Sequence, residues 1–141
     1  MRIWQKPISI DEVTRMNAGT ASDLVGIEFT EFGDDFLCAR LAVQQKTMQP
    51  YGRLHGGVSV VLAETLGSCA AYYACAQDFY ALGLEINANH IKGVSGGYID
   101  GVARPFHRGR STQVWGIELR NEMQELICIS RLTVAIVKMS S

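Results

Sequence analysis

The chain has 141 residues, a formal net charge of −1 and 48% hydrophobic residues, which is the size of one globular domain. It carries no basic stripe, so we expect no nucleic-acid binding. The N-terminus lacks the apolar stretch of a signal peptide. The four cysteines lack zinc-ligand spacing, so we interpret them as buried, reduced thiols. We therefore expect a single cytoplasmic domain over residues 1–141, without a metal or a cofactor.

The first predicted helix is short and begins after Ser9. This serine can cap the helix, and Glu12 falls at the third helical position, as in a capping box. Gly19 then ends the helix.

A β-hairpin and a loop follow. Residues 25–32 and 36–43 are strand-like, with apolar residues alternating in the second run, and Gly33-Asp34-Asp35 joins them. Residues 44–57 contain Pro50 and several glycines and are predicted to form a loop.

A long helix is predicted over residues 57–76. Glu64 is its only charged residue, and a helix that is apolar all round is expected to be buried. Residues 54–76 are also long enough to cross a membrane, but a central carboxylate is expensive in lipid. We therefore expect no membrane span.

Four strand-like runs complete the chain, at residues 81–92, 97–105, 112–121 and 126–138, and turn residues separate them. No β-α alternation is present. The sequence predicts an α+β architecture, in which a curved antiparallel sheet wraps around one long helix.

The start of the long helix has the composition of an anion site. Gly56 and Gly57 open it, and the first N–H groups of a helix have no partner within it. These amides, with side-chain donors from Gln49 and His55, can stabilise the oxyanion of an acyl-transfer reaction. Glu64 is then the nucleophile or general base.

Helix geometry separates these two groups within one chain. Gly56 and Glu64 are eight residues apart, about 12 Å along the axis, so one carbonyl carbon cannot lie close to both. We therefore expect an active site shared across a homodimer. Ser68 lies four residues beyond Glu64 on the same face and can hydrogen-bond Glu64, an attacking water or a backbone carbonyl one turn earlier.

Each motif also has a structural interpretation. Glu64 alone fits a hydrogen-bonded carboxylate, His55-Gly56-Gly57 alone fits a helix cap, and Ser68 alone fits packing. The motifs together, at this spacing, favour a site. The basic turn His107-Arg108-Gly109-Arg110, with Lys92, makes a cationic group suited to nucleotide phosphates, or else an ordinary solvated turn.

The run from Gln49 to His55-Gly56-Gly57, with Glu64 and Ser68, resembles the hotdog-fold acyl-CoA thioesterases of the phenylacetate and enterobactin pathways. The similarity extends over nearly the whole chain, including residues 83–90 and 105–109. Among these enzymes the chain is most similar to those that act on 1,4-dihydroxy-2-naphthoyl-CoA in menaquinone biosynthesis.

The resemblance implies a role for each matching residue. Glu64 is the nucleophile or general base, the Gly56 amide polarises the carbonyl with help from Gln49 and His55, and Ser68 supports the water. Leu82 and Gly83 line the acyl site. The CoA phosphates are assigned to His90, Lys92, His107, Arg108 and Arg110. Coenzyme A belongs to the substrate, and the assembly is a homotetramer of two dimers.

Three other functions remain open from the sequence. The thiol can belong to an acyl or aryl carrier protein, as in a proofreading thioesterase. A 3-hydroxyacyl thioester dehydratase would use His55 and Glu64 as its catalytic pair. A non-catalytic acyl-CoA binding module is the third, although the sequence shows no output domain.

Overall fold

A computed structural model describes residues 1–140 of the chain. Its helices and strands follow in the order α1 (Ile10–Asn17), α2 (Ala21–Leu24), β1 (Glu28–Phe32), β2 (Leu37–Ala42), the 3-10 helix η1 (Gln45–Thr47), α3 (Gly56–Ala74), β3 (Phe79–His90), β4 (Tyr98–Arg108), β5 (Thr112–Arg120) and β6 (Leu126–Lys138).

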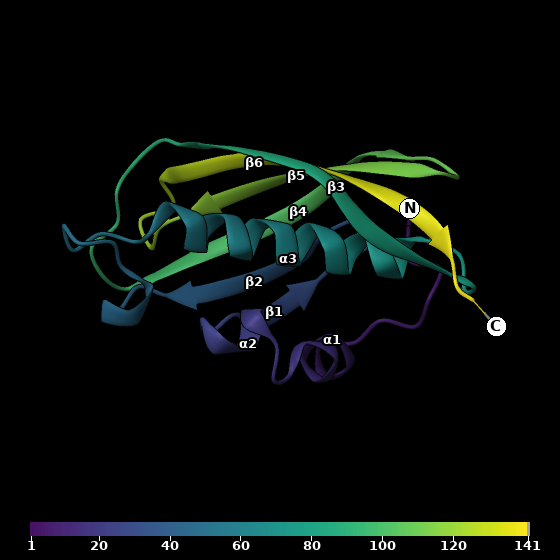
Figure 1. Ribbon diagram of the computed structural model, residues 1–141, viewed down its shortest axis with the longest axis horizontal. Coiled ribbons are helices and arrows are strands. Elements are labelled where there is room, and N and C mark those ends of the chain that lie inside the picture. Colours follow the sequence, from purple (N-terminus) through teal and green to yellow (C-terminus); the bar gives the residue numbers. More distant parts are fainter. Residues whose placement is uncertain (141) are drawn as a thin grey trace.

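The six strands form one antiparallel sheet in the order β1-β2-β4-β5-β6-β3. The sheet curves around α3, which lies along its inner face, while α1 and α2 lie beside β1 (Figure 1). This arrangement confirms the predicted α+β architecture. Strand β3 follows α3 directly and, within residues 1–140, pairs only with β6, so one flank of the helix lies beside a strand whose outer edge is free.

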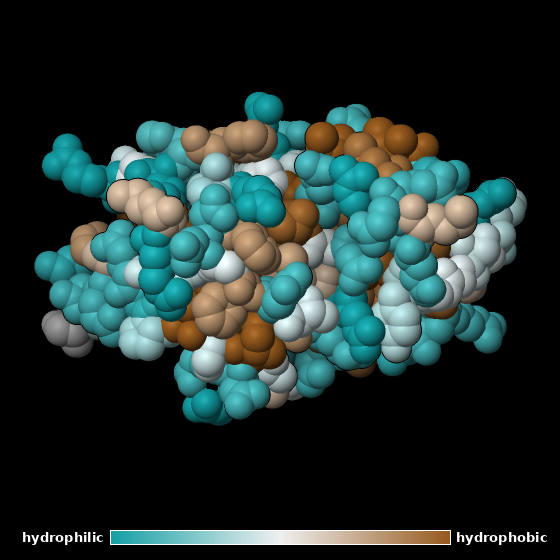
Figure 2. Space-filling view, turned by 180° about the vertical axis from the view of Figure 1, so that it is seen from behind, coloured by the Kyte–Doolittle hydropathy of each residue, from teal (hydrophilic) through white to brown (hydrophobic). Residues whose placement is uncertain are grey.

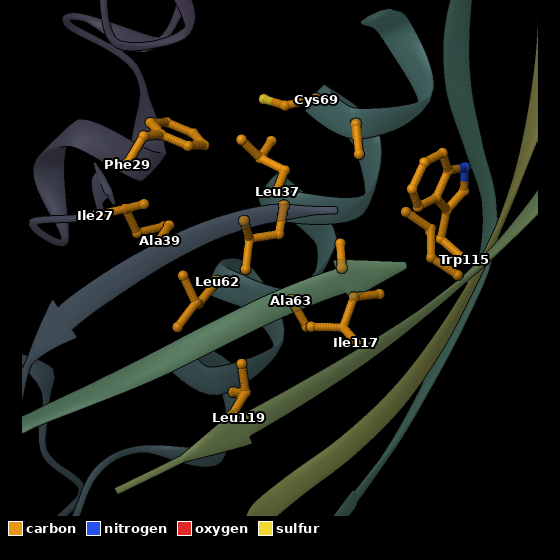
Figure 3. Close-up of a cluster of buried hydrophobic side chains, with 14 of the residues drawn as sticks. Ile27, Phe29, Leu37, Ala39, Leu62, Ala63, Cys69, Trp115, Ile117 and Leu119 are labelled. Atoms are coloured by element: carbon orange, nitrogen blue, oxygen red, sulfur yellow. The ribbon is translucent and has the colours of Figure 1, made fainter. Parts of the chain in front are cut away.

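The core lies between α3 and the inner face of the sheet. Leu62 and Ala63 of α3 lie against inward side chains of β2 and β5, among them Leu37 and Ile117 (Figure 3). Small residues allow the helix to approach closely, since a Cβ on Gly67 would lie 2.7 Å from Leu132 Cδ2. Gly67 therefore serves close helix–sheet packing.

The N-terminal segment holds the far end of α3. Lys6 is 5% exposed, and its Nζ donates hydrogen bonds to the carbonyl oxygens of Tyr72, Cys75, Ala76 and Phe79 at 2.8–3.0 Å. The last carbonyls of a helix have no partner within it. Lys6 therefore satisfies the C-terminal end of α3 with a positive charge, which the helix dipole favours.

The end of β4 differs from the sequence prediction. β4 continues beyond Pro105 to Arg108, because a bulge between Pro105 and His107 leaves Phe106 out of the ladder. Such a bulge allows the strand to contain Pro105, which has no backbone N–H. A second bulge in β3, between Gly83 and Glu85, lies at the same level of the sheet.

Two short helices, α2 and η1, were not predicted. The prediction that Ser9 caps α1 is confirmed, because its side chain accepts a hydrogen bond from the Glu12 amide.

Hydrophobic residues form small patches among hydrophilic ones on the face shown in Figure 2. Within residues 1–140, no helix is long and apolar enough to span a membrane.

Candidate active site

The first turn of α3 presents one amide that its neighbours leave free. His55 caps the helix, and its Nδ1 accepts a hydrogen bond of 2.8 Å from the Gly57 amide. The Gly56 amide has no hydrogen-bond acceptor in the described part of the chain. A free N–H at the positive end of a helix is suited to a carbonyl or carboxylate oxygen. In neutral His55 the proton is on Nε2, which remains able to donate.

Gln49 reaches the same region from the loop before α3. Its side-chain oxygen accepts a hydrogen bond from the Tyr51 amide, and its backbone amide donates to the Arg53 carbonyl at 2.7 Å. These bonds hold the loop in a tight turn. They leave the Gln49 amide group, which has two N–H donors, at the edge of a cavity.

His90, the last residue of β3, lies directly over the helix start. A Cβ on Gly56 would be only 2.8 Å from His90 Nε2, so a side chain at residue 56 would displace the imidazole. A cavity of about 280 Å³ opens here, between the loop, the first turn of α3 and the end of β3. Its lining includes Gln49, Gly56, Ser59 and His90.

Glu64 lies two turns further along α3 and against a different part of β3. A Cβ on Gly83 would lie 2.8 Å from Glu64 Oε2. The side chain is partly exposed and has no ion pair among the described residues. Ser68 is partly exposed on the same helix, and no hydrogen bond joins the two within the described chain. The Glu64 carboxylate is therefore free to act on a ligand.

Gly56 and Glu64 are far apart within one chain. Their neighbours on β3, His90 and Gly83, pair with Cys128 and Val134 of β6, which are six residues apart, about 20 Å at the usual rise of a strand. A single chain thus presents two separate half-sites along one edge strand. One holds the free amide and the other holds the carboxylate.

The cationic residues also divide into two groups. Arg108 pairs with Gln113, which lies level with Val134 and Gly83 across the sheet, so the β4–β5 turn lies at the Glu64 end. Lys92 lies beyond His90 at the other end and forms an ion pair with Glu125. The hydrogen bond from Lys92 lowers the pKa of the Glu125 carboxyl. One chain therefore does not gather the five residues that we expected to bind phosphates, and His107 and Arg108 belong to β4 rather than to the turn.

Leu82 and Leu84 flank Gly83 on the edge strand, and both are largely exposed. No group of three or more potential metal ligands from His, Cys, Asp and Glu occurs within residues 1–140.

Comparison with known proteins assigns the chain to a family. Residues 51–128, which include the free amide, the carboxylate and the whole of β3, match the model of the Thioesterase superfamily. The chain belongs to the Thioesterase superfamily. A thioesterase from Haemophilus influenzae has the same fold, with a TM-score of 0.96 and 40% identity over 99% of this chain and 97% of that one.

Two curated relatives bring more specific names. The 1,4-dihydroxy-2-naphthoyl-CoA hydrolase of Escherichia coli is 44% identical over 95% of this chain and 98% of the relative. The proofreading thioesterase EntH of Cronobacter turicensis is 41% identical, again over 95% and 98%. The expected hotdog fold and thioester hydrolase class are therefore confirmed for this member of the Thioesterase superfamily.

Two residues of the cavity were not anticipated from the sequence of this thioesterase. Ser59 lies three residues after Gly56, a spacing that places both on one helix face and that could have identified it. Arg53 extends across the backbone of Gly93, where a Cβ would lie 2.6 Å from Arg53 Cδ. Nothing in the sequence indicated that this contact would form.

Proposed function

We propose that this thioesterase hydrolyses acyl-CoA thioesters, with a preference for aromatic acyl groups such as 1,4-dihydroxy-2-naphthoyl or benzoyl. The free Gly56 amide at the start of α3, beside a cavity, is the observation that carries the proposal. That amide polarises the thioester carbonyl, with Gln49 and His55 as further donors. Glu64 acts as nucleophile or general base, and Ser68 supports the attacking water.

The active site is shared between two subunits. β3 leaves one edge of the sheet unpaired, and Leu82 and Leu84 expose apolar surface along it. Antiparallel pairing of two β3 strands, centred on Ile86 and Asn87, places His90 of one chain opposite Gly83 of the other. The amide of one chain then faces the carboxylate of its partner, which removes the separation found within one chain.

The same pairing brings together the two cationic groups. His90 and Lys92 of one subunit come to the level at which the partner carries His107, Arg108 and Arg110. Lys92, His107, Arg108 and Arg110 bind the phosphates of coenzyme A, and Leu82 and Gly83 line the acyl site. His90 lies over Gly56 and is therefore assigned to the carbonyl instead. No step of this mechanism requires a metal or a cofactor.

The dimers associate further through the outer face of the sheet. A groove of about 370 Å³ crosses this face, and its lining includes Phe106, Ile129, Arg104, Arg131 and Glu118. A face with both charge signs and exposed apolar groups can pair with its own copy about a twofold axis. We therefore propose a homotetramer that acts in the cytoplasm.

Release of free CoA tests the reaction. Wild type and Glu64→Gln are compared on 1,4-dihydroxy-2-naphthoyl-, benzoyl-, phenylacetyl- and straight-chain acyl-CoA. Wild type should release CoA, with aromatic esters preferred, and the substitution should lower kcat by about 1,000-fold or more because it removes the base or nucleophile. Undiminished turnover by Glu64→Gln rules out the assigned role. Activity restricted to acyl carrier proteins identifies the proofreading reaction instead.

Mixed dimers test the shared site. Gly56→Pro removes the free amide, Glu64→Ala removes the carboxylate, and each homodimer should be inactive. A dimer of one Gly56→Pro chain and one Glu64→Ala chain retains one intact pair and should recover up to half the wild-type activity. A purified mixed dimer without activity contradicts sharing.

A further inference from the structure

Ser59 is a buried hydroxyl without a protein partner. It is 4% exposed, it lines the cavity at the start of α3, and it makes no side-chain hydrogen bond within residues 1–140. The only fully shielded side-chain nitrogen or oxygen without a partner in that part of the chain is Arg40 Nε. The Ser59 hydroxyl therefore keeps its open side towards the cavity.

Ser59 Oγ is not among the fully shielded atoms without a partner, so water can reach it from the cavity in the free protein. A bound group that excludes this water without replacing its hydrogen bond leaves the hydroxyl unpaired, which is costly. A serine can donate one hydrogen bond and accept two. A ligand oxygen that enters the cavity gains this partner, whereas an apolar ligand group leaves the hydroxyl unpaired. The cavity thus favours a ligand that places an oxygen next to the Ser59 hydroxyl.

The position of Ser59 shows which part of a thioester it meets. It follows Gly56 by three residues and lies deeper in the protein. With the thioester carbonyl at the Gly56 amide, one substituent points into the cavity and the other leads out. The CoA arm ends in a charged nucleotide that must reach solvent, so the acyl group is the part that enters.

The rest of the lining fits a flat, mostly apolar acyl group. Val94 and Ile127 are buried and Leu54 is partly buried, and all three line the same cavity. Ser59 contributes a polar group from α3 to these apolar walls, while His90 and Gln49 lie nearer the carbonyl. A ring with one oxygen substituent combines both kinds of surface.

We propose that Ser59 is a specificity-determining residue, whose hydroxyl binds an oxygen substituent on the acyl group of the substrate. This inference rests on the proposed thioester hydrolysis and adds a residue that selects among its substrates. Ser59 takes no part in the chemical step. Its contribution appears in the ratio of two esters that differ by one oxygen.

The test compares benzoyl-CoA with its 2-, 3- and 4-hydroxy derivatives in wild type, Ser59→Ala and Ser59→Cys. Wild type should prefer one hydroxy isomer over benzoyl-CoA in kcat/KM by about five- to thirty-fold, the usual value of one hydrogen bond to a buried partner. Ser59→Ala should lose most of this preference. Ser59→Cys keeps the side-chain volume with a weaker donor and should retain a smaller preference. Ser95→Ala, in an exposed loop, should keep the wild-type ratio.

The outcomes separate the inference from the function on which it rests. Loss of the preference in Ser59→Ala with its retention in Ser95→Ala supports the assignment. An unchanged ratio in Ser59→Ala and Ser59→Cys overturns it, as does a wild type that prefers no isomer while hydrolysing all four esters. If folded wild type hydrolyses no ester of any kind, thioester hydrolysis itself fails and the inference falls with it.

Discussion

The carboxylate of Glu64 lies against the backbone of Gly83, so closely that a Cβ at residue 83 would be 2.8 Å from Oε2. Residue 83 is on the edge strand and residue 64 is on the central helix. The absence of a side chain at one position thus determines where the carboxylate of the other can lie.

Gly83→Ala should therefore reduce turnover more than stability. The clash involves the mobile end of a side chain, which can rotate away at little cost to the fold, but a displaced catalytic group can lower the rate by about 100-fold. Steady-state kcat and thermal denaturation measure the two effects. Gly96→Ala is the matched control, since a Cβ there meets nothing within 4 Å. Equal kcat values in the two variants would contradict a catalytic position for Glu64.

Lys6→Met should destabilise the fold by about 3 kcal/mol. The change removes the donor shared by four carbonyl oxygens at the C-terminal end of α3, and buried acceptors without partners are costly. Urea denaturation of Lys6→Met beside Lys46→Met, which changes an exposed lysine, measures the difference. Equal urea midpoints for both variants would show that water replaces the Lys6 hydrogen bonds without loss of stability.

Leu84→Asp should dissociate the proposed dimer and abolish hydrolysis. Leu84 is 62% exposed on the edge strand, and a buried, unpaired carboxylate at a subunit contact is strongly unfavourable. Light scattering after gel filtration gives the mass, and CoA release gives the activity. Leu24→Asp alters a leucine on α2 that is 77% exposed and should change neither. A fully active Leu84→Asp monomer would exclude the shared site.

The thiols should be slow to react at neutral pH. Burial, with the nearby Glu31 carboxylate, raises the pKa of Cys38 to about 11, and burial also raises the pKa of Cys69 and Cys128. At pH 8 Cys38 should react with a disulfide reagent about 100-fold more slowly in the native than in the unfolded protein, because its thiolate is scarcer. Each of the three thiols has a higher pKa in the folded than in the unfolded protein, so the stability it contributes is fully present below the pKa of an unfolded cysteine. That stability is lost as the pH rises through the pKa of the folded state. Equal native and unfolded rates would contradict this.

Sequence patterns predicted the elements whose signals are local. The capping Ser9, the alternation in β2 and the uniformly apolar α3 each depend on neighbours in the chain, and the structure confirms them. Helix α2 was missed because four residues provide too little periodicity. The extension of β4 past Pro105 was missed because a bulge depends on the partner strand.

The candidate site likewise combines features that a local sequence pattern predicts with features that depend on distant segments. The spacing of Gly56 and Glu64 already indicated that one chain separates them, because helix rise is constant. The contacts of His90 with Gly56 and of Lys92 with Glu125 depend on how distant segments meet, and no local pattern reveals them. Helix periodicity could have identified Ser59, but small residues in a buried helix usually serve close packing.

The position of the two half-sites on one edge strand bears on how such an enzyme behaves on dilution. In the proposed shared site, a subunit that carries the amide at one end and the carboxylate at the other holds both reactive parts but no complete active centre. Specific activity should then depend on protein concentration, because each proposed centre needs two chains. A newly made chain would leave the thioester pool of its cell intact until a second copy had accumulated.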